Sequence, residues 1–319
     1  MRLVLTKLPT LVLTLLVVSF LTFMLTSLLP GDPEVQILGP DNATPEARAQ
    51  VREDLRLDDP IPTRYGAWLA DASTGDLGRS YRSGQEVSEA IKERLPVTLE
   101  IGLLAIGIAL AIAIPLGTWS AYKAGTTTDR AITGATFGLL AVPNFMMAIL
   151  LILVFAEGFG WLPATGWTRL TEDPLDNLRT ALLPALSLAI GELAVFTRLL
   201  RSDMIATLQQ DSITMARAKG ISPARILFRH ALRPSSFSLM TVVGLQVGAI
   251  ISGSVIVETL FAVPGVGRLL VDSILQRDLQ VVQGIALVIA ASFVIINGVV
   301  DLLYSLLDPR IRHGRLAAA

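Results

Sequence analysis

The sequence predicts an all-α, polytopic membrane protein with six transmembrane helices and a small helical external segment after the first helix. The composition indicates this class, because 52% of the 319 residues are hydrophobic and only 17% are charged. A soluble domain of this length needs more charge to cover its surface. The second observation is a series of six long apolar runs, each close to the length that crosses the hydrocarbon core of a bilayer as a helix.

The first transmembrane helix is expected within residues 1–29, where residues 8–29 carry no charge. This run is longer than the apolar part of a secretory signal peptide and no small-residue cleavage site follows it, so we expect an uncleaved helix. The other five runs form the predicted helical core, residues 95–308, and residues 309–319 form a tail. These runs span residues 101–122, 131–156, 181–197, 235–257 and 281–307.

The short segments between the runs differ in charge. Residues 1–7, 123–130, 198–233 and 308–319 hold 14 Lys and Arg against 4 Asp and Glu, whereas residues 157–180 and 261–280 hold 4 against 6. Because short loops rich in Lys and Arg stay in the cytoplasm, both termini and the 198–233 loop are predicted to be cytoplasmic. Residues 30–94 are then external, with short helices expected at residues 44–57, 65–70 and 87–95.

The loop at residues 198–233 reads as a helix, a break and a second helix. Residues 215–219 favour a helix, and Gly220 is a usual helix stop. Ser222 followed by Pro223 predicts a new helix with a side-chain cap and proline at its first position. Positive charge alone would fix topology or attract anionic lipid. Neither role needs a hinge between two helices, so a cytoplasmic partner is the favoured interpretation.

These residues also carry a resemblance to a known family. Residues 216–220 (Ala-Arg-Ala-Lys-Gly) and 229–233 (Arg-His-Ala-Leu-Arg) are similar to the cytoplasmic loop of binding-protein-dependent ABC importer permeases. Segments 29–33, 75–78, 94–96, 264–270 and 307–312 resemble, in order and spacing, the first permease type of that family's peptide and nickel group. Thr214, Met215 and Pro234 depart from the family pattern within the loop.

The resemblance implies a type I ABC importer permease fold and a role in ATP-driven import of di- or oligopeptides, with this chain forming half of the translocation pathway. ATP and Mg would be bound by partner subunits, so this chain is expected to be no enzyme and to bind no cofactor or metal. The implied partners are a second homologous permease subunit, two cytoplasmic ATPase subunits, an external substrate-binding protein and the lipid bilayer, with no nucleic acid. The implied location is the inner or plasma membrane of a prokaryote.

Three groups of residues are candidates for function. By resemblance, residues 211–233 couple the chain to the ATPase subunits, through Asp211, Met215, Ala216, Arg217, Ala218, Lys219, Gly220, Ser222 and Pro223. Polar groups within spans are costly unless paired or functional, and glycines four residues apart allow close helix packing. The candidates for the pathway or for helix packing are therefore Glu192, Gly244, Gln246 and Gly248. By resemblance to the family, the candidates for an external gate are Glu258, Pro264, Gly265 and Gly267.

Two alternatives remain open at this point. The substrate could be another of those carried by the same group, namely a nickel chelate, an opine, glutathione or an oligosaccharide. The alternative from another class is a self-sufficient secondary transporter, although the sequence has no evident internal repeat of the kind common in that class. A membrane enzyme is disfavoured, because the chain has no cysteine, no Gly-x-Ser-x-Gly element and no phosphate-binding Gly-x4-Gly-Lys-Ser/Thr element.

Overall fold

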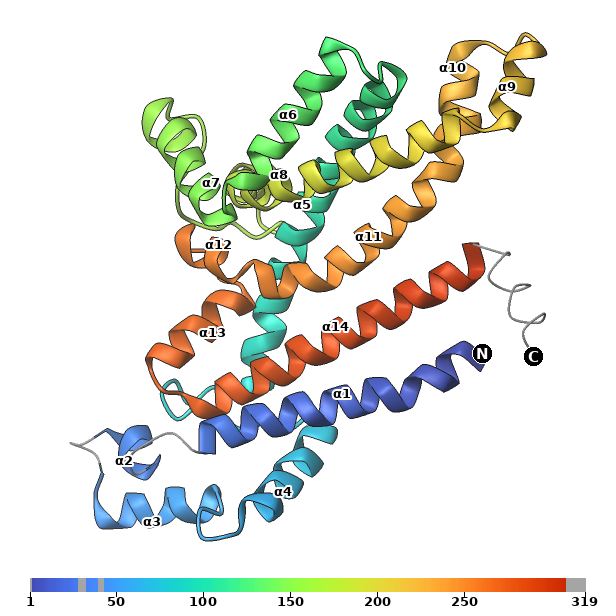
Figure 1. Ribbon diagram of the computed structural model, residues 1–319. Coiled ribbons are helices and arrows are strands. Elements are labelled where there is room, and N and C mark those ends of the chain that lie inside the picture. The colour runs from blue at the N-terminus through green and yellow to red at the C-terminus, as the bar shows by residue number, and fades with distance from the viewer. Residues whose placement is uncertain (1, 28–32, 40–42, 308–319) are drawn as a thin grey trace. The chain divides into compact units, whose positions relative to one another are not determined.

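The computed structural model of the 319-residue chain describes residues 2–27, 33–39 and 43–307 (Figure 1). These residues form helices joined by turns and loops, with one isolated antiparallel bridge between Arg79 and Glu86. The predicted all-α fold is therefore confirmed. In chain order the elements are α1 (Arg2–Ser27), α2 (Pro33–Leu38), α3 (Pro45–Asp54), α4 (Ile61–Ser73), α5 (Val87–Tyr122), α6 (Thr127–Ala141), α7 (Asn144–Leu151), the π-helical η1 (Ile152–Gly158), α8 (Pro174–Leu208), α9 (Asp211–Ala218), α10 (Pro223–Arg225), the π-helical η2 (Ile226–Ala231), α11 (Leu232–Gly253), α12 (Val255–Leu260), α13 (Val266–Leu275) and α14 (Leu279–Leu307).

The chain forms two compact units. The first consists of Met1–Thr98 with Pro264–Gly298, and the second of Leu99–Val263 with Val299–Ala319. Helices α5 and α14 contribute residues to both units. The predicted division into segments 1–29, 30–94, 95–308 and 309–319 stays a prediction. Residues 28–32 and 308–319 lie outside the described residues. They include the whole predicted tail and parts of two segments that resemble the family.

The first unit is held together by an apolar core between α5, α13 and α14. Its buried members are Leu77, Val87, Ile91, Val266, Val281 and Ile285. A Cβ atom added at Gly284 would lie 2.5 Å from a methyl carbon of Val87, so glycine permits the close approach of α14 to α5 there. The backbone amide of Val266 donates to the Thr98 hydroxyl over 2.9 Å, which ties the start of α13 to α5.

Helix α4 of the first unit packs on α1. The Tyr65 ring lies edge-on to Phe20 with centroids 5.2 Å apart, and the Tyr65 hydroxyl is 2.8 Å from that of Ser19. Residues 44–57 and 65–70 were predicted to be helical, and α3 and α4 confirm both predictions. The Thr44 hydroxyl caps α3 by accepting from the amide of Ala47 at 3.2 Å. The separate helix predicted at residues 87–95 is wrong, because these residues form the first turns of α5.

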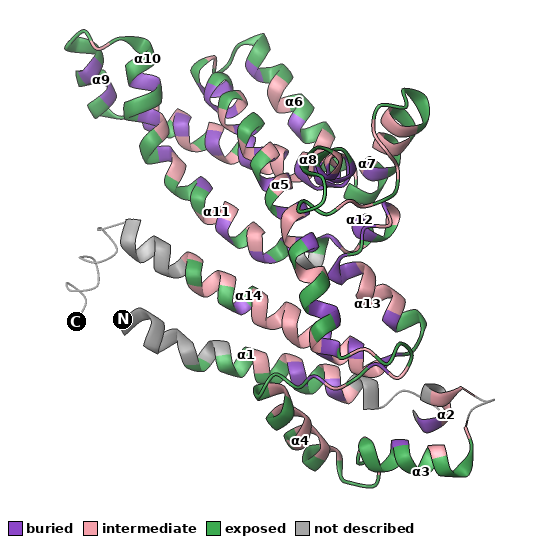
Figure 2. Ribbon diagram, turned by 180° about the vertical axis from the view of Figure 1, so that it is seen from behind, coloured by how far each residue is buried: buried purple, intermediate pink, exposed green. Residues whose placement is uncertain are grey.

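Helix α8 is the centre of the second unit. It packs against α6, α7 and α11, and small or apolar buried residues recur along it, among them Ala185, Ala189, Phe196 and Leu200. Figure 2 shows much of α6 as exposed ribbon. Its exposed side chains include the large apolar residue Phe137, which is 53% exposed. An apolar surface of this kind suits lipid or another membrane helix better than water.

Among the described residues, α5, α8 and the part of α14 from Leu279 to Val300 are long and apolar enough to cross a membrane. Helix α6 with α7 and η1 adds a fourth crossing if that bent pair is one span, and α1 contains a shorter apolar stretch, Val12–Met24. The count of six transmembrane helices thus stays a prediction. The unbroken third span expected at residues 131–156 is wrong, because the chain bends by 99° between α6 and α7. Pro143 stands at this break and favours extended backbone at Val142, whose φ and ψ are −95° and 119°.

Candidate functional site

The predicted stop and restart of the loop at residues 211–233 are both present. Helix α9 ends at Ala218, and Gly220 has a φ of +73°, the left-handed region that glycine adopts without strain. The amide of Gly220 donates to the carbonyl of Arg217 at 3.0 Å, and that of Ile221 to the carbonyl of Ala216 at 3.2 Å. These two bonds form the Schellman arrangement that satisfies carbonyls at a helix end.

The Ser222 side-chain cap is the part of this prediction that is wrong. Ser222 occupies the N-cap position of α10 and Pro223 follows as the first helical residue, but the serine side chain makes no capping hydrogen bond. Its backbone carbonyl instead accepts from the amide of Ile226 at 3.0 Å. Proline, with its fixed φ, is therefore the local feature that starts the helix.

Helix α9 has one buried side and one exposed side. Ile213 and Ala216, three residues apart, are buried against Ile226 of η2, with Leu208 and Ile221 packed around them. Figure 2 shows this division along α9. The remaining candidate residues are solvent-exposed: Asp211, Met215, Arg217, Ala218, Lys219, Gly220, Ser222 and Pro223. The small apolar cluster packs α9 against the start of the following helix.

A hydrogen bond that the sequence analysis missed closes the base of this loop. The hydroxyls of Thr207, near the end of α8, and Ser235, near the start of α11, lie 2.9 Å apart and are both buried. Serine and threonine are common near helix ends, so neither residue stands out in the sequence. The contact joins the helices that enter and leave the loop.

An ion pair nearby was also missed. Asp129 of α6 accepts two hydrogen bonds from Arg201 of α8, at 2.6 and 2.7 Å. The same carboxylate accepts from the Ser120 hydroxyl at 2.6 Å and from the Gly125 amide at 2.8 Å. Asp129 is only 3% exposed, so four donors replace the water it loses. The four contacts join α5, α6 and α8.

The structure brings together two of the candidates for the pathway or for helix packing. The Gln246 amide of α11 donates to both carboxylate oxygens of Glu192 on α8, at 2.9 and 2.7 Å. This interaction explains how a carboxyl group is accommodated inside an apolar run. It gives the pair a helix-joining role, while a part in the pathway stays a prediction.

Gly244 and Gly248, the other two candidates of this group, are buried on α11. A Cβ atom at Gly244 would lie 2.5 Å from a methyl carbon of Val300, too close for any real side chain. Gly134 and Gly138 have the same four-residue spacing on α6, but a Cβ atom at either would meet nothing within 4 Å among the described residues. Spacing alone therefore does not identify which glycines are tightly packed.

The candidates for an external gate fall in different units. Glu258 belongs to the second unit, where it is fully buried and accepts a hydrogen bond from the Ser254 hydroxyl at 2.8 Å. Pro264, Gly265 and Gly267 belong to the first unit, where Gly265 is the N-cap of α13. Helix α13 begins directly after Gly265, and the gate itself stays a prediction.

Within the described part of the chain, no three or more His, Asp or Glu residues form a group suited to a metal ion. The expectations that the chain binds no metal and no cofactor remain predictions. The features that combine exposure with a defined geometry are the loop at residues 211–233 and the polar contacts that support it.

Comparison with known proteins identifies the family of the chain. Residues 113–313 match the family described as binding-protein-dependent transport system inner membrane component, and residues 1–102 match the N-terminal part of such membrane components. An oligopeptide transport system permease protein of Bacillus subtilis is 39% identical over 302 residues, which cover 94% of this chain and 95% of that protein. A dipeptide transport system permease protein of Escherichia coli is 34% identical, with 98% and 99% covered.

A protein of Brucella abortus whose name describes a peptide transport system permease is 42% identical over 299 residues, covering 94% of this chain and 95% of that protein. These likenesses run through both units and the loop at residues 211–233. The chain therefore belongs to the inner membrane components of binding-protein-dependent transport systems, the membrane-spanning and non-catalytic permeases of ABC importers, and within them to the peptide group.

Proposed function

We propose that this chain forms half of the translocation pathway of an ATP-driven importer for di- or oligopeptides. The observation that carries this proposal is the full-length likeness to relatives named for oligopeptide and dipeptide transport. These relatives come from two different bacteria, and both names specify short peptides. Nickel chelates, opines, glutathione and oligosaccharides are less favoured, because none of the relatives compared above is named for them.

The loop at residues 211–233 couples the chain to ATP hydrolysis in this proposal. The exposed side of α9 enters a groove on an ATPase subunit, a form of recognition in which a short helix fits a partner surface. Because Ile213 and Ala216 hold α9 against Ile226, a displacement of α9 passes to η2 and α11 as rigid-body motion. The Thr207–Ser235 hydrogen bond transmits the same motion to the end of α8.

In this proposal both termini and the loop at residues 198–233 face the cytoplasm of a prokaryote, and the chain lies in the inner membrane. The excess of Lys and Arg in the short segments supports this orientation. In this proposal the end of α5 lies at a membrane–water interface, where the Lys123 ammonium lies 5.6 Å from the ring centroid of Trp119 and 5.4 Å from that of Tyr122. Aromatic residues beside a lysine are typical of a membrane–water interface.

The complete importer contains a second homologous permease subunit, two cytoplasmic ATPase subunits and an external substrate-binding protein. The ATPase subunits bind ATP and Mg, and this chain binds neither. The absence of a phosphate-binding Gly-x4-Gly-Lys-Ser/Thr element from the sequence supports this division of labour.

Co-purification tests the proposal. The tagged chain, produced together with the genes that neighbour it, should retain a second permease and two ATPase subunits. Met215 is 60% exposed on α9, so Met215→Asp should reduce the ATPase subunits retained by burying a charge in the groove. Thr63→Asp, at an exposed position of α4, should leave them unchanged. An isolated chain that catalyses uptake driven by an ion gradient would instead be a secondary transporter.

A further inference from the structure

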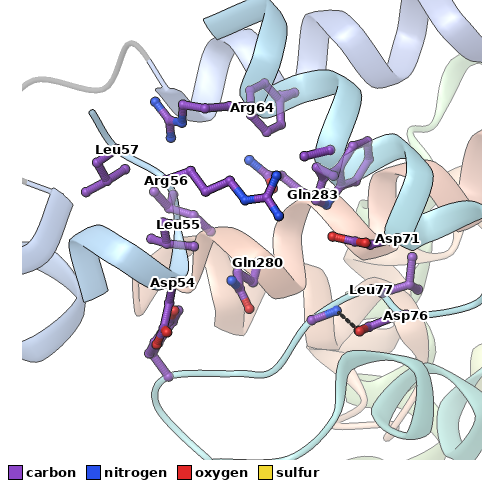
Figure 3. A pocket seen from close by; sticks show the side chains of 16 residues that line it. Asp54, Leu55, Arg56, Leu57, Arg64, Asp71, Asp76, Leu77, Gln280 and Gln283 are labelled. Carbon is purple, nitrogen blue, oxygen red and sulfur yellow. Dashed lines mark hydrogen bonds between the residues drawn. The ribbon is translucent and has the colours of Figure 1, made fainter. Parts of the chain in front are cut away.

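A cavity of about 220 Å³ lies in the first unit, outside all the candidate residues considered above. Its wall combines the turn after α3, one side of α4, the loop at residues 76–81 and the first turn of α14 (Figure 3). Phe23, Trp68 and Leu77 supply an apolar part of this wall. A cavity of this volume suits one amino acid or a short peptide.

Five charged residues line this cavity: Asp54, Arg56, Arg64, Asp71 and Asp76. Two of opposite sign, Arg56 and Asp71, are solvent-exposed and are not paired with each other. Arg56 extends across the middle of the space, and Asp71 stands on the opposite wall, on α4 (Figure 3). Among the described residues, neither side chain takes part in an ion pair or a side-chain hydrogen bond. Opposite charges that share a cavity without meeting leave room for a ligand that carries both complementary charges.

The backbone of Arg56 is unusual. Its φ is +51°, and it occupies the position after the C-cap of α3, where its amide donates to Glu53 at 3.0 Å and that of Leu57 donates to Arg52 at 2.9 Å. Glycine is the usual residue at this position, because it adopts positive φ without a steric penalty. An arginine there is strained, and strained residues cluster at ligand-binding sites.

Neutral hydrogen-bonding groups also line the cavity. The Gln280 side-chain oxygen accepts from the Arg79 amide at 2.9 Å, which fixes the orientation of that side chain. Burial, together with Asp54 and Asp278, raises the pKa of Tyr81 to about 12, so its phenol stays protonated and can donate. These groups suit the polar part of an amino acid or a peptide bond.

We infer that this cavity is a binding site for a small zwitterion, an amino acid or a dipeptide, whose carboxylate meets the Arg56 guanidinium and whose ammonium meets the Asp71 carboxylate. The choice of ligand rests on the proposed function, because peptides are the proposed cargo. Arg56 and Asp71 both lie on the segment after α1, and the site does not depend on the loop that couples the chain to ATPase subunits.

Isothermal titration of the full-length chain in lipid nanodiscs tests this inference. The probes are alanine, alanyl-alanine and N-acetyl-alanyl-alanine amide, which lacks both charges. Saturable binding of alanine or alanyl-alanine, but not of the neutral probe, is expected. Binding by alanine alone limits the site to amino acids, whereas a preference for alanyl-alanine indicates a peptide site. No saturable binding of either zwitterion overturns the inference.

Arg56→Gly and Arg277→Gly form a matched pair of variants. Arg277 is exposed, follows the C-cap of α13 with a φ of +56°, and does not line the cavity. Both substitutions relieve the same backbone strain, so neither should reduce stability. Arg56→Gly should weaken zwitterion binding at least about tenfold, the effect of losing a charge-assisted hydrogen bond, and Arg277→Gly should not. Equal binding by the two variants would refute the site.

Asp71→Asn should weaken the same zwitterion while keeping the shape of the cavity. Uptake by the complete importer separates this inference from the proposed function. Zwitterion binding without ATP-driven peptide uptake would support the binding site and refute the proposed function. ATP-driven uptake without zwitterion binding to this chain would support the proposed function and refute the binding site. The same holds if uptake occurs and Arg56→Gly does not weaken zwitterion binding.

Discussion

Arg201 of α8 donates two hydrogen bonds to the carboxylate of Asp129 on α6, from Nε at 2.6 Å and from a terminal guanidinium nitrogen at 2.7 Å. The Asp129 side chain is 4% exposed and that of Arg201 is 27% exposed. Such a two-pronged contact combines strength with fixed geometry. It joins α6 to α8 within the second unit, at the end of α8 that leads toward the loop at residues 211–233.

Asp129→Ala should destabilise the chain by about 3 kcal/mol, because it leaves the Arg201 guanidinium without its partner in a mostly buried place. Thermal unfolding in nanodiscs measures the change. Asp272→Ala is the control, since Asp272 and Arg268 lie 3.7 Å apart and are both partly exposed. An exposed pair of this kind contributes less than about 1 kcal/mol. Equal losses in the two variants would contradict the role given to Asp129.

Gly220→Val should reduce ATP-driven uptake severalfold while the complex still hydrolyses ATP. A side chain at Gly220 would meet nothing within 4 Å, so the effect comes from its φ of +73°. That conformation costs an L-residue roughly 1–2 kcal/mol, and valine tolerates it least. The paired measurement is the number of peptides imported per ATP hydrolysed.

Gly220→Asn is the control for this loop, because asparagine enters the left-handed region more readily than other side chains. It should keep most of the uptake that Gly220→Val loses. If both variants import peptide at the wild-type ratio to ATP, the turn at Gly220 has no part in coupling.

Glu192 and Gln246 should show an energetic coupling of about 1 kcal/mol or more in a double-mutant cycle with alanine. The physical reason is the pair of hydrogen bonds from one amide to both carboxylate oxygens. The coupling energy is obtained from the free energies of unfolding of the wild type, both single variants and the double variant. Additive losses would mean that the two side chains do not interact in the membrane.

Gly244→Ala and Gly134→Ala should have opposite effects on stability. A methyl group at Gly244 collides with Val300, whereas one at Gly134 meets no described atom within 4 Å. Overpacking costs about 1–3 kcal/mol, but alanine in an open helix position stabilises by about 0.5–1 kcal/mol over glycine. Comparison of their melting temperatures checks this. A destabilised Gly134→Ala would indicate a contact at α6 with a partner or lipid.

Local features of the loop at residues 211–233 were predictable from the sequence, since Gly220 and Pro223 act on their own backbone. The break at Pro143 had a local signal too, but the apolar residues on both sides concealed it within one hydrophobic run. The Ser222 cap failed for a different reason. A serine can occupy the N-cap position while its side chain points elsewhere, and sequence does not specify that orientation.

Contacts between residues far apart in the chain could not be predicted from the sequence. Asp129 and Arg201 are 72 residues apart, and each reads as an ordinary charge in a short connecting segment. Glu192 and Gln246 were both noticed as polar residues in apolar runs, but their pairing depends on how α8 packs on α11. The cavity around Arg56 draws on five separate segments, and no motif links them.

The most direct test of the central claim is uptake of a radiolabelled dipeptide by proteoliposomes that contain this chain with its partner permease, ATPase subunits and binding protein. The account predicts accumulation that requires ATP, the binding protein and this chain together. Accumulation without ATP, or unchanged accumulation when this chain is omitted, would contradict it.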